Sequence, residues 1–428
     1  MLGQTHHKKS ADMWTTLIKK LFLLSPHGAH RIFGIFRLTV LQVSNESEGA
    51  EARVLVNYPR FPVVRSWWNR GRLHNLATGY RETMLFRVFR DVELSPNRRG
   101  GYIREGPDLR VPDNGLPGLP RLHFPGAPVA GIVEQVKGRV LIKAVKPERE
   151  YEVGIFAGSM APHNWFHWLI DNLPTLYLAR YLPAEFEHYP VLVPASASQR
   201  PNWRKSLQAV VGQRSVVFVH DDEWVTVKSL VRLEGVTLPN PRPLSGIHQA
   251  RISLMLAPLL DYRDHLLTKL QLQTVGITPG KRVFIGRKAH AVRRYNDDEI
   301  SALAAARGFE KVYLEELGFQ ESIRLFREAE FIVGPHGAGW ANLLFSHPRA
   351  KAMLWTWAGE KEDNWYENVA YASGVHYRQV FVPVDEDGVQ DRRSSDYWLD
   401  PALFTRELDQ LVATGDQGRP KKSSRKNR

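Results

Sequence analysis

The chain has 428 residues, a formal net charge of +13 and no cysteine. The length predicts two domains rather than one, and 43% hydrophobic with 24% charged residues is the composition of a globular protein. Without cysteine the chain forms no disulfide, thiolate metal site or cysteine nucleophile. The positive charge suits anionic ligands such as phosphates, nucleic acid or a membrane surface.

The N-terminal segment shows no pattern typical of export or membrane insertion. The apolar run Leu21–Leu24 ends at Ser25 and Pro26, so it is far shorter than the core of a signal peptide. No stretch approaches the ~20 apolar residues of a membrane span. Residues 13–24 fit either a basic amphipathic helix on an anionic membrane or a surface-packed terminus. We expect a cytoplasmic protein, at most peripheral to the inner face of the membrane.

The middle of the chain predicts alternating strands and helices. A loop rich in glycine and proline at 107–128 precedes an expected hairpin at 131–145. Strands are then expected at 153–157, 189–193, 215–220 and 229–233, and helices at 164–181 and 203–211. This alternation predicts a parallel sheet covered by helices. A helix at 247–272 is expected to connect this half to the second.

The second half repeats the alternation. Strands are expected at 282–285, 311–314, 331–333, 352–356 and 377–384, with helices at 297–307, 320–329 and 403–412. A short helix should begin near Gly339. The chain therefore predicts an α/β protein of two Rossmann-like, doubly wound units that face a cleft, with ligands at the carboxyl ends of the strands.

The sharpest motif is the strand, turn and helix start within Phe331–Phe345. Its glycines permit tight turning, and the free N–H groups at the helix start attract an anion. His336 lies in the turn, where it can donate a hydrogen bond to a diphosphate. The alternative is a plain strand-to-helix connection with His336 in solvent. The motif is neither the dinucleotide fingerprint nor a P-loop.

A second motif is a basic loop after the strand expected at 282–285. It carries Arg287, Lys288, Arg293 and Arg294. The planar guanidinium suits phosphate oxygens, although a solvated charge run is the alternative. Asn296 and Glu299 follow, and their spacing predicts a capping box for the next helix.

A third motif places His163, His167 and Asp171 at intervals of four residues, on one face of the helix expected at 164–181. A His–Asp pair can hold one member as a general base. Two alternatives stay open: a buried structural pair, and a metal-ligand set that would need a further ligand from elsewhere. The acidic triplet at 385–387 is interpreted as surface.

These three motifs together resemble glycosyltransferase family 61, which includes capsular polysaccharide biosynthesis enzymes. The resemblance covers residues 153–384 and rests on Asn164–Pro174, Arg287, Arg294, Asn296–Glu299, Leu314–Ala329 and Gly334–Phe345. It implies a GT-B fold and inverting, metal-independent transfer from a nucleotide sugar, with a UDP-sugar favoured and no separate cofactor. The expected acceptor is a glycan or lipid-linked glycan. Peripheral contact with an anionic membrane is expected, and nucleic acid is not.

The resemblance assigns roles to individual residues. The donor diphosphate would be held by Arg287, Arg293, Arg294, His336, Gly337, Ala338 and Asn342. The general base would be Asp171, or His167 oriented by it, with His163, Asn164 and Trp168 on the acceptor side. The corresponding regions are an extension (1–50), an acceptor-side domain (51–245), a connecting helix (246–275), a nucleotide-sugar domain (276–414) and a basic disordered tail (415–428).

Two departures from the family pattern bear on the donor site. Trp340-Ala341 stands where the family has Leu or Ile followed by a small polar residue, which is expected to reshape the donor pocket. Gly286 stands where the family tends to have Ser. The competing interpretations are a glycan-binding protein without catalysis, a nucleic-acid-binding protein that uses the positive charge, and a zinc hydrolase built on the three residues of the helical motif.

Overall fold

The computed structural model describes most of the chain between residues 38 and 416. The segments left out of the description are 1–37, 70–71, 98, 113–121, 123–129, 137, 144–145, 160, 222, 240–251, 274–276, 289–292, 358–364, 383–395 and 417–428. The predicted amphipathic segment 13–24, the acidic triplet 385–387 and nearly all of the basic tail therefore lie outside the described residues.

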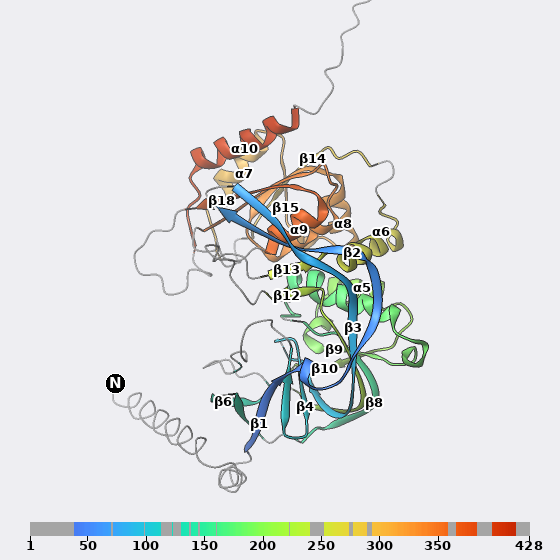
Figure 1. Cartoon of the computed structure of the whole chain (residues 1–428). Coiled ribbons are helices and arrows are strands. Elements are labelled where there is room, and N and C mark those ends of the chain that lie inside the picture. Colours follow the sequence, from blue (N-terminus) through green and yellow to red (C-terminus); the bar gives the residue numbers. More distant parts are fainter. Residues whose placement is uncertain are drawn as a thin grey trace, which may run out of the picture. The chain divides into compact units, whose positions relative to one another are not determined.

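The chain divides into two compact units, shown in sequence colours in Figure 1. Unit 1 comprises Met1–Asn57, Thr83–Arg204 and Val211–Gly235, and unit 2 comprises Tyr58–Glu82, Lys205–Val210 and Val236–Arg428. Two long strands, β2 (Ala52–Asn69) and β3 (Arg72–Ser95), contribute residues to both units, as does helix α5 (Pro201–Val211).

Unit 1 has a parallel half that the sequence predicts. Its strands are β8 (Arg149–Phe156), β9 (Val191–Pro194), β10 (Val216–Val219) and β11 (Val225–Leu233), in the order β10-β9-β8-β11 with every neighbouring pair parallel. All four residues of β9 are buried, which is typical of a strand flanked on both sides in a parallel sheet. The strands predicted at 153–157, 189–193, 215–220 and 229–233 are confirmed.

The other half of unit 1 is mostly antiparallel. From β11 the sheet continues through β3, β4 (Tyr102–Glu105), β5 (Asp108–Val111), β1 (Leu38–Asn45), β7 (Arg139–Lys143) and β6 (Ile132–Val136). Of these neighbours only β1 and β5 are parallel. The hairpin predicted at 131–145 is β6–β7. The rest of this half was not predicted, and β5 lies at the start of the segment predicted as a loop at 107–128. Unit 1 therefore carries a mixed sheet rather than a doubly wound parallel one.

A continuous helical segment follows β8 in unit 1. It consists of α3 (Trp165–His167), the wider π-turn η2 (Trp168–Asn172), α4 (Leu173–Tyr177) and the 3-10 turn η3 (Leu178–Tyr181). It confirms the helix predicted at 164–181, but the sequence did not predict the π-turn. Short 3-10 turns are η1 (Glu46–Glu48), η4 (Ala184–Phe186) and η5 (Ala195–Ser198).

The described part of unit 2 contains a parallel sheet in the order β15-β14-β16-β17-β18. Its strands are β14 (Lys281–Ile285), β15 (Glu310–Val312), β16 (Ala329–Pro335), β17 (Lys351–Trp357) and β18 (His376–Val382), all in parallel pairs. Its helices are α7 (Asp297–Ala305), α8 (Phe319–Glu328), α9 (Trp365–Ser373) and α10 (Pro401–Asp416), with 3-10 turns η6 (Leu314–Glu316) and η7 (Ala338–Phe345). Of these, α9 and η6 were not predicted, and the strand predicted at 311–314 ends earlier, at Val312.

The long helix predicted at 247–272 is wrong at its start. Residues 247–251 lie outside the description, and Ile252–Met255 form strand β13, which pairs with β12 (Thr237–Pro239) and with β2. The helix α6 begins only at Leu256 and ends at Lys269. The error has a physical source, because a short apolar run fits the core face of a strand as well as that of a helix.

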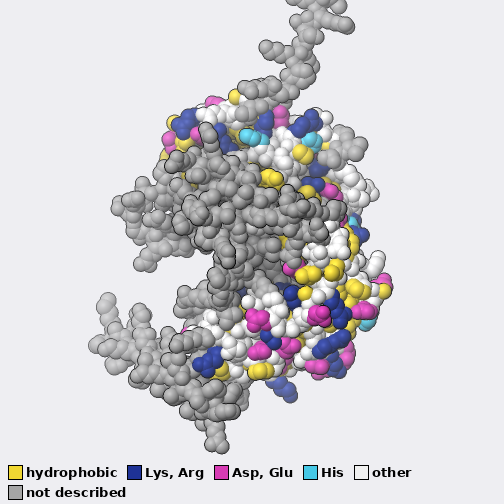
Figure 2. All heavy atoms as spheres, in the orientation of Figure 1, with side chains coloured by type: hydrophobic (Ala, Val, Ile, Leu, Met, Phe, Trp, Pro, Cys, Tyr) yellow, Lys and Arg dark blue, Asp and Glu magenta, His cyan; other side chains and the backbone are white. Residues whose placement is uncertain are grey.

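The described surface mixes charges of both signs. On the face in Figure 2, basic and acidic side chains are interspersed over the described residues rather than gathered into one basic stripe. Ion pairs between described residues include Arg149–Glu223 and Lys228–Glu152. Of the helices described, none has both the length and the apolar character that crossing a membrane requires.

Candidate functional site

The glycine-rich turn of unit 2 is packed tightly where strand β16 leads into η7. A Cβ on Gly334 would lie 2.7 Å from Cβ of Ile285 on the neighbouring strand β14, so the two strands approach too closely for any side chain there. Trp340 is buried, and its indole N–H donates to the carbonyl of Pro335 at 2.8 Å. Trp340 therefore supports the turn from inside, and its effect on the shape of the donor pocket stays a prediction.

Helix α9 holds the other side of this turn. The hydroxyl of Tyr366 donates to the carbonyl of Gly337 at 3.0 Å, and its ring meets the His336 imidazole edge-on with centroids 5.0 Å apart. A Cβ on Gly339 would lie 2.5 Å from Leu314 Cδ1. Tyr366 was missed from the sequence because nothing local to it marks a contact with a turn almost thirty residues earlier in the chain.

Two arginines converge on His336. Arg287 follows β14, and its Nη2 donates to the His336 carbonyl at 2.5 Å. Arg293 Nη1 lies 2.9 Å from His336 Nδ1. A guanidinium has donors only, so Nδ1 is the acceptor and the neutral ring carries its proton on Nε2. The structure thus joins three of the predicted donor-binding residues, with the ring proton of His336 on Nε2.

The electrostatics of this cluster favour an anion. Burial, and next the neighbouring Arg293 charge, lower the pKa of Arg287. Aromatic groups lie near Arg287: Tyr295 and Tyr397 stack with centroids 5.6 Å apart, and Trp355 Nε1–H donates to the Tyr397 hydroxyl. Burial raises the pKa of Tyr397 to about 12. Two adjacent guanidinium cations repel each other, and a bound anion would offset that repulsion.

Two other predicted donor residues are engaged elsewhere. Arg294 bonds Asp396 through its backbone N–H and its Nε, both at 2.8 Å, and its side chain is largely exposed. Asn342 is buried and donates to the Gly339 carbonyl at 2.9 Å within η7. In this arrangement Arg294 pairs with a carboxylate, and Asn342 supports the helix. Gly337 is the N-cap of η7 and Ala338 is its first residue, and backbone N–H groups at a helix start attract anions.

Asn296 is the N-cap of α7, but the predicted capping box is not formed. Asn296 Nδ2 donates to Glu299 at 2.8 Å, but no side-chain bond from Asn296 caps the helix. Its amide instead exchanges two hydrogen bonds with the backbone of Leu399. The residue therefore ties α7 to the segment before α10.

The third motif forms a close pair in unit 1. His167 Nδ1 lies 2.6 Å from Asp171 Oδ2, with 16% of the histidine side chain exposed and 2% of the aspartate. An ionised carboxylate only accepts, so Nδ1 carries the proton. In the neutral form of this tautomer the lone pair is on Nε2. The pair has the geometry of a general base and the carboxylate that orients it.

The predicted acceptor-side residues have unequal exposure. Asn164 is exposed and serves as the N-cap, since its side chain accepts from Phe166 N at 2.9 Å. His163 is exposed one residue before it. Trp168 is completely buried, so its side chain packs in the core and any effect on an acceptor is indirect. Within the described part of the chain, no three His, Asp or Glu side chains gather closely enough to hold a metal ion.

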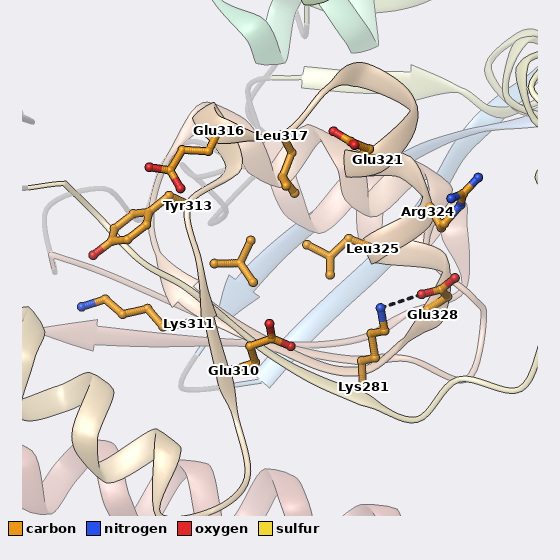
Figure 3. A pocket seen from close by; sticks show the side chains of 11 residues that line it. Lys281, Glu310, Lys311, Tyr313, Glu316, Leu317, Glu321, Arg324, Leu325 and Glu328 are labelled. Atoms are coloured by element: carbon orange, nitrogen blue, oxygen red, sulfur yellow. Dashed lines mark ion pairs between the residues drawn. The ribbon is translucent and has the colours of Figure 1, made fainter.

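A separate hollow of about 410 Å³ runs beside the edge strand β15. Figure 3 shows Leu317 and Leu325 pointing into it and the Lys281–Glu328 ion pair at its rim. None of the predicted site residues lines this hollow. We therefore assign the candidate donor site to the convergence of Arg287 and Arg293 on His336 instead. Tyr313, at one end of the hollow, explains the glycine at position 286: a Cβ there would lie 2.9 Å from the Tyr313 ring.

Comparisons with known proteins agree on one group. Residues 165–353 match the family model described as Glycosyltransferase 61. The EGF domain-specific O-linked N-acetylglucosamine transferase of Drosophila melanogaster is 26% identical over 278 residues, which are 58% of this chain and 51% of that protein. The alpha-1,3-arabinosyltransferase XAT3 of Oryza sativa subsp. japonica is 31% identical over 120 residues, 26% of this chain and 20% of that protein. The chain thus spans about half the length of the first relative and a fifth of the second.

Proposed function

We propose that this chain, which belongs to glycosyltransferase family 61, transfers a sugar from a nucleotide-activated donor to a hydroxyl group of a glycan or glycoconjugate. The resemblance inferred from the motifs is confirmed by the family match, which spans both the His167 helix and the His336 turn. The observation that carries the proposal is the convergence of Arg287 and Arg293 on His336, where strands β14 and β16 end.

In the proposed donor site the nucleotide diphosphate lies against this cluster. The bond between the anomeric carbon and the diphosphate oxygen breaks, and negative charge grows on the departing diphosphate. Arg287 and Arg293 offer guanidinium donors, His336 offers Nε2–H, and the start of η7 adds backbone N–H groups. Together they would supply the charge stabilisation that a metal ion provides elsewhere. We therefore propose a metal-independent reaction, with a UDP-sugar as the favoured donor.

In the proposed acceptor site His167 is the general base. Its Nε2 takes the proton of the acceptor hydroxyl as that oxygen attacks the anomeric carbon, while Asp171 orients the ring and stabilises the imidazolium that forms. A single displacement from the face opposite the leaving group inverts the configuration. We further propose a GT-B fold, which the resemblance to the family implies.

The acceptor and setting are proposed from the family. The two relatives are named for different sugars, N-acetylglucosamine and arabinose, so family membership does not select the sugar. We propose synthesis of a surface or capsular polysaccharide, because the family includes such enzymes. A cytoplasmic location with peripheral membrane contact, and a lipid-linked acceptor, stay predictions.

The test is thermal unfolding of the purified chain against UDP, GDP, CDP and their sugars, with and without EDTA. A nucleotide at ~100 times its dissociation constant stabilises a protein by ~2.7 kcal/mol. We expect one nucleoside diphosphate, UDP first, to raise the melting temperature equally with EDTA present. Arg287→Ala should abolish the shift, and the charge-matched control Arg324→Ala, an exposed residue of α8, should retain it.

The result separates the competing interpretations. If no nucleotide raises the melting temperature of the wild-type chain, the donor site is not where the arginines converge, and a glycan-binding role without catalysis gains support. If EDTA removes the shift, the reaction is not metal-independent. If Arg324→Ala loses the shift as fully as Arg287→Ala, the effect reflects net charge rather than a built site.

A further inference from the structure

The helix that carries His167 contains a wide turn. In η2 the N–H of Leu173 bonds the carbonyl of Trp168, five residues earlier instead of four. Pro174 supplies a reason, since it has no N–H and its ring crowds the carbonyl four residues before it. A turn of this kind inserts one residue and rotates the side chains beyond it relative to a regular helix.

The extra residue brings Asn172 into a bridging position. Asn172 is buried, and its Nδ2 donates to the His167 carbonyl at 2.9 Å. Its Oδ1 accepts from the backbone N–H of Ser159, also at 2.9 Å, in the loop that follows β8. One buried side chain thus joins the backbone of His167 to the loop at the carboxyl end of the parallel strands.

That loop is itself fixed to the sheet. Arg232 at the end of β11 donates to the Gly158 carbonyl at 2.8 Å, and β11 pairs directly with β8. Asn172 therefore transmits the position of the sheet to the backbone that carries His167. Within the helix, Thr175 Oγ–H donates to the Asp171 carbonyl at 2.7 Å, which holds the second member of the pair.

We infer that Asn172 is a positioning residue that sets where the His167 imidazole stands, an inference that rests on the proposed function. It does not touch the reacting atoms. The carboxylate of Asp171 sets the direction of the ring within the helix, and Asn172 sets the place of the helix relative to the strand ends. A misplacement of about 1 Å at a reacting group can lower a rate about 100-fold, so losing this bridge should affect turnover far more than binding.

The primary test needs no substrate. The Cε1–H NMR signal of His167, assigned by its absence in His167→Gln, is compared between the wild type, Asn172→Ala and the control Tyr189→Phe. Tyr189 also makes a buried side-chain hydrogen bond in unit 1, to Ser229 at 3.0 Å. Both substitutions should lower the melting temperature, but only Asn172→Ala should move or broaden the His167 signal. A folded Asn172→Ala with an unmoved signal overturns the inference.

Kinetics supply the second measurement, with UDP-N-acetylglucosamine as the probe donor. Asn172→Ala should lower kcat about 10-fold or more while KM and the UDP-induced melting shift stay within about 3-fold of wild type. Equal losses in Asn172→Ala and Tyr189→Phe would indicate general destabilisation and overturn the inference.

Two further outcomes stay distinguishable. If Asn172→Ala does not fold, Asn172→Asp replaces it, because the aspartate still accepts from Ser159 N–H and loses only the donor to His167, and its His167 signal should also move. A wild-type chain that binds no UDP contradicts the proposed function, whereas the NMR comparison still decides whether Asn172 positions His167.

Discussion

The two candidate clusters each centre on a histidine, in opposite surroundings. His167 in unit 1 has a carboxylate at Nδ1, which accepts the ring proton. His336 in unit 2 has a guanidinium at Nδ1, which donates to the ring. The same side chain is therefore set as an acceptor at Nε2 in one unit and as a donor at Nε2 in the other. One arrangement suits removing a proton from a hydroxyl, and the other suits holding a phosphate oxygen.

The clusters also differ in how the chain builds them. The His167–Asp171 pair comes from one helix turn, and its four-residue spacing alone brings the two side chains together. The His336 cluster is assembled from loops more than forty residues apart, which meet only because β14 and β16 are neighbours in a parallel sheet. The contact within the local pair does not require the sheet, whereas the assembled cluster depends on β14 and β16 staying neighbours.

The largest expected effect is at the carboxylate of the local pair. Asp171→Asn keeps the shape but allows the amide to donate, so the ring can adopt the tautomer that lacks a lone pair at Nε2. Turnover of the accepted nucleotide sugar should fall by about 10³-fold, within the range for general bases. The UDP-induced melting shift should stay unchanged, because the substitution does not alter the arginine cluster.

The matched control for this change is Asp221→Asn. Asp221 is a unit 1 carboxylate that accepts from Ser196 N at 3.1 Å, and its substitution should leave turnover within about 2-fold, as surface changes usually do. If Asp171→Asn retains wild-type turnover, the local pair is structural and the base must be sought elsewhere. The two histidines would then differ in their hydrogen bonds, but His167 would not act as the general base.

The next effect tests how the assembled cluster depends on the sheet. Gly334→Ala places a Cβ 2.7 Å from Ile285 Cβ and 3.1 Å from its carbonyl oxygen, so β14 and β16 must separate. We expect a loss of about 1–3 kcal/mol in the free energy of unfolding, measured by urea denaturation, and weaker UDP binding. Gly280→Ala is the control, since a Cβ there meets nothing within 4 Å. Equal stability of the two variants would contradict the close approach.

These dependences explain what could be predicted from the sequence. The His167–Asp171 pair and the strands of both parallel regions follow from short-range patterns, so they were predicted. Most of the antiparallel half of unit 1 was missed because charged residues interrupt its apolar alternation, as Arg87 and Arg90 do in β3. The pairing of Arg294 with Asp396, 102 residues later, and the bridge made by Asn172 depend on tertiary contacts and an inserted residue that no local pattern marks.

A smaller effect on UDP binding is expected at Arg293, which contacts His336 and has a strained backbone conformation. Its φ is 62°, in the left-handed region that costs a non-glycine residue about 1 kcal/mol. Arg293→Ala and Arg293→Gly both remove the guanidinium and should weaken UDP binding about 10-fold. The glycine variant should be the more stable of the two by about 0.5–1 kcal/mol. Unchanged UDP affinity in both variants would remove Arg293 from the proposed donor site.

The smallest effect concerns a second histidine of unit 2 with arginine neighbours. His347 Nδ1 accepts from Arg349 N–H at 3.1 Å. Burial, followed by the charges of Arg349 and Arg327, lowers its pKa below the usual value. Below about pH 6.5, His347 takes up a proton in the unfolded chain more readily than in the folded chain. The neutral His347 therefore contributes to the free energy of unfolding above that pH, and the contribution is lost as the pH falls.

His347→Asn removes the titrating group and keeps an acceptor for Arg349 N–H. The melting temperature of the variant should therefore fall less than that of the wild type between pH 7 and pH 5, by about 1 °C, in buffers without phosphate. A parallel fall in both proteins would show that burial and the arginine charges do not lower the pKa of His347 in the folded chain.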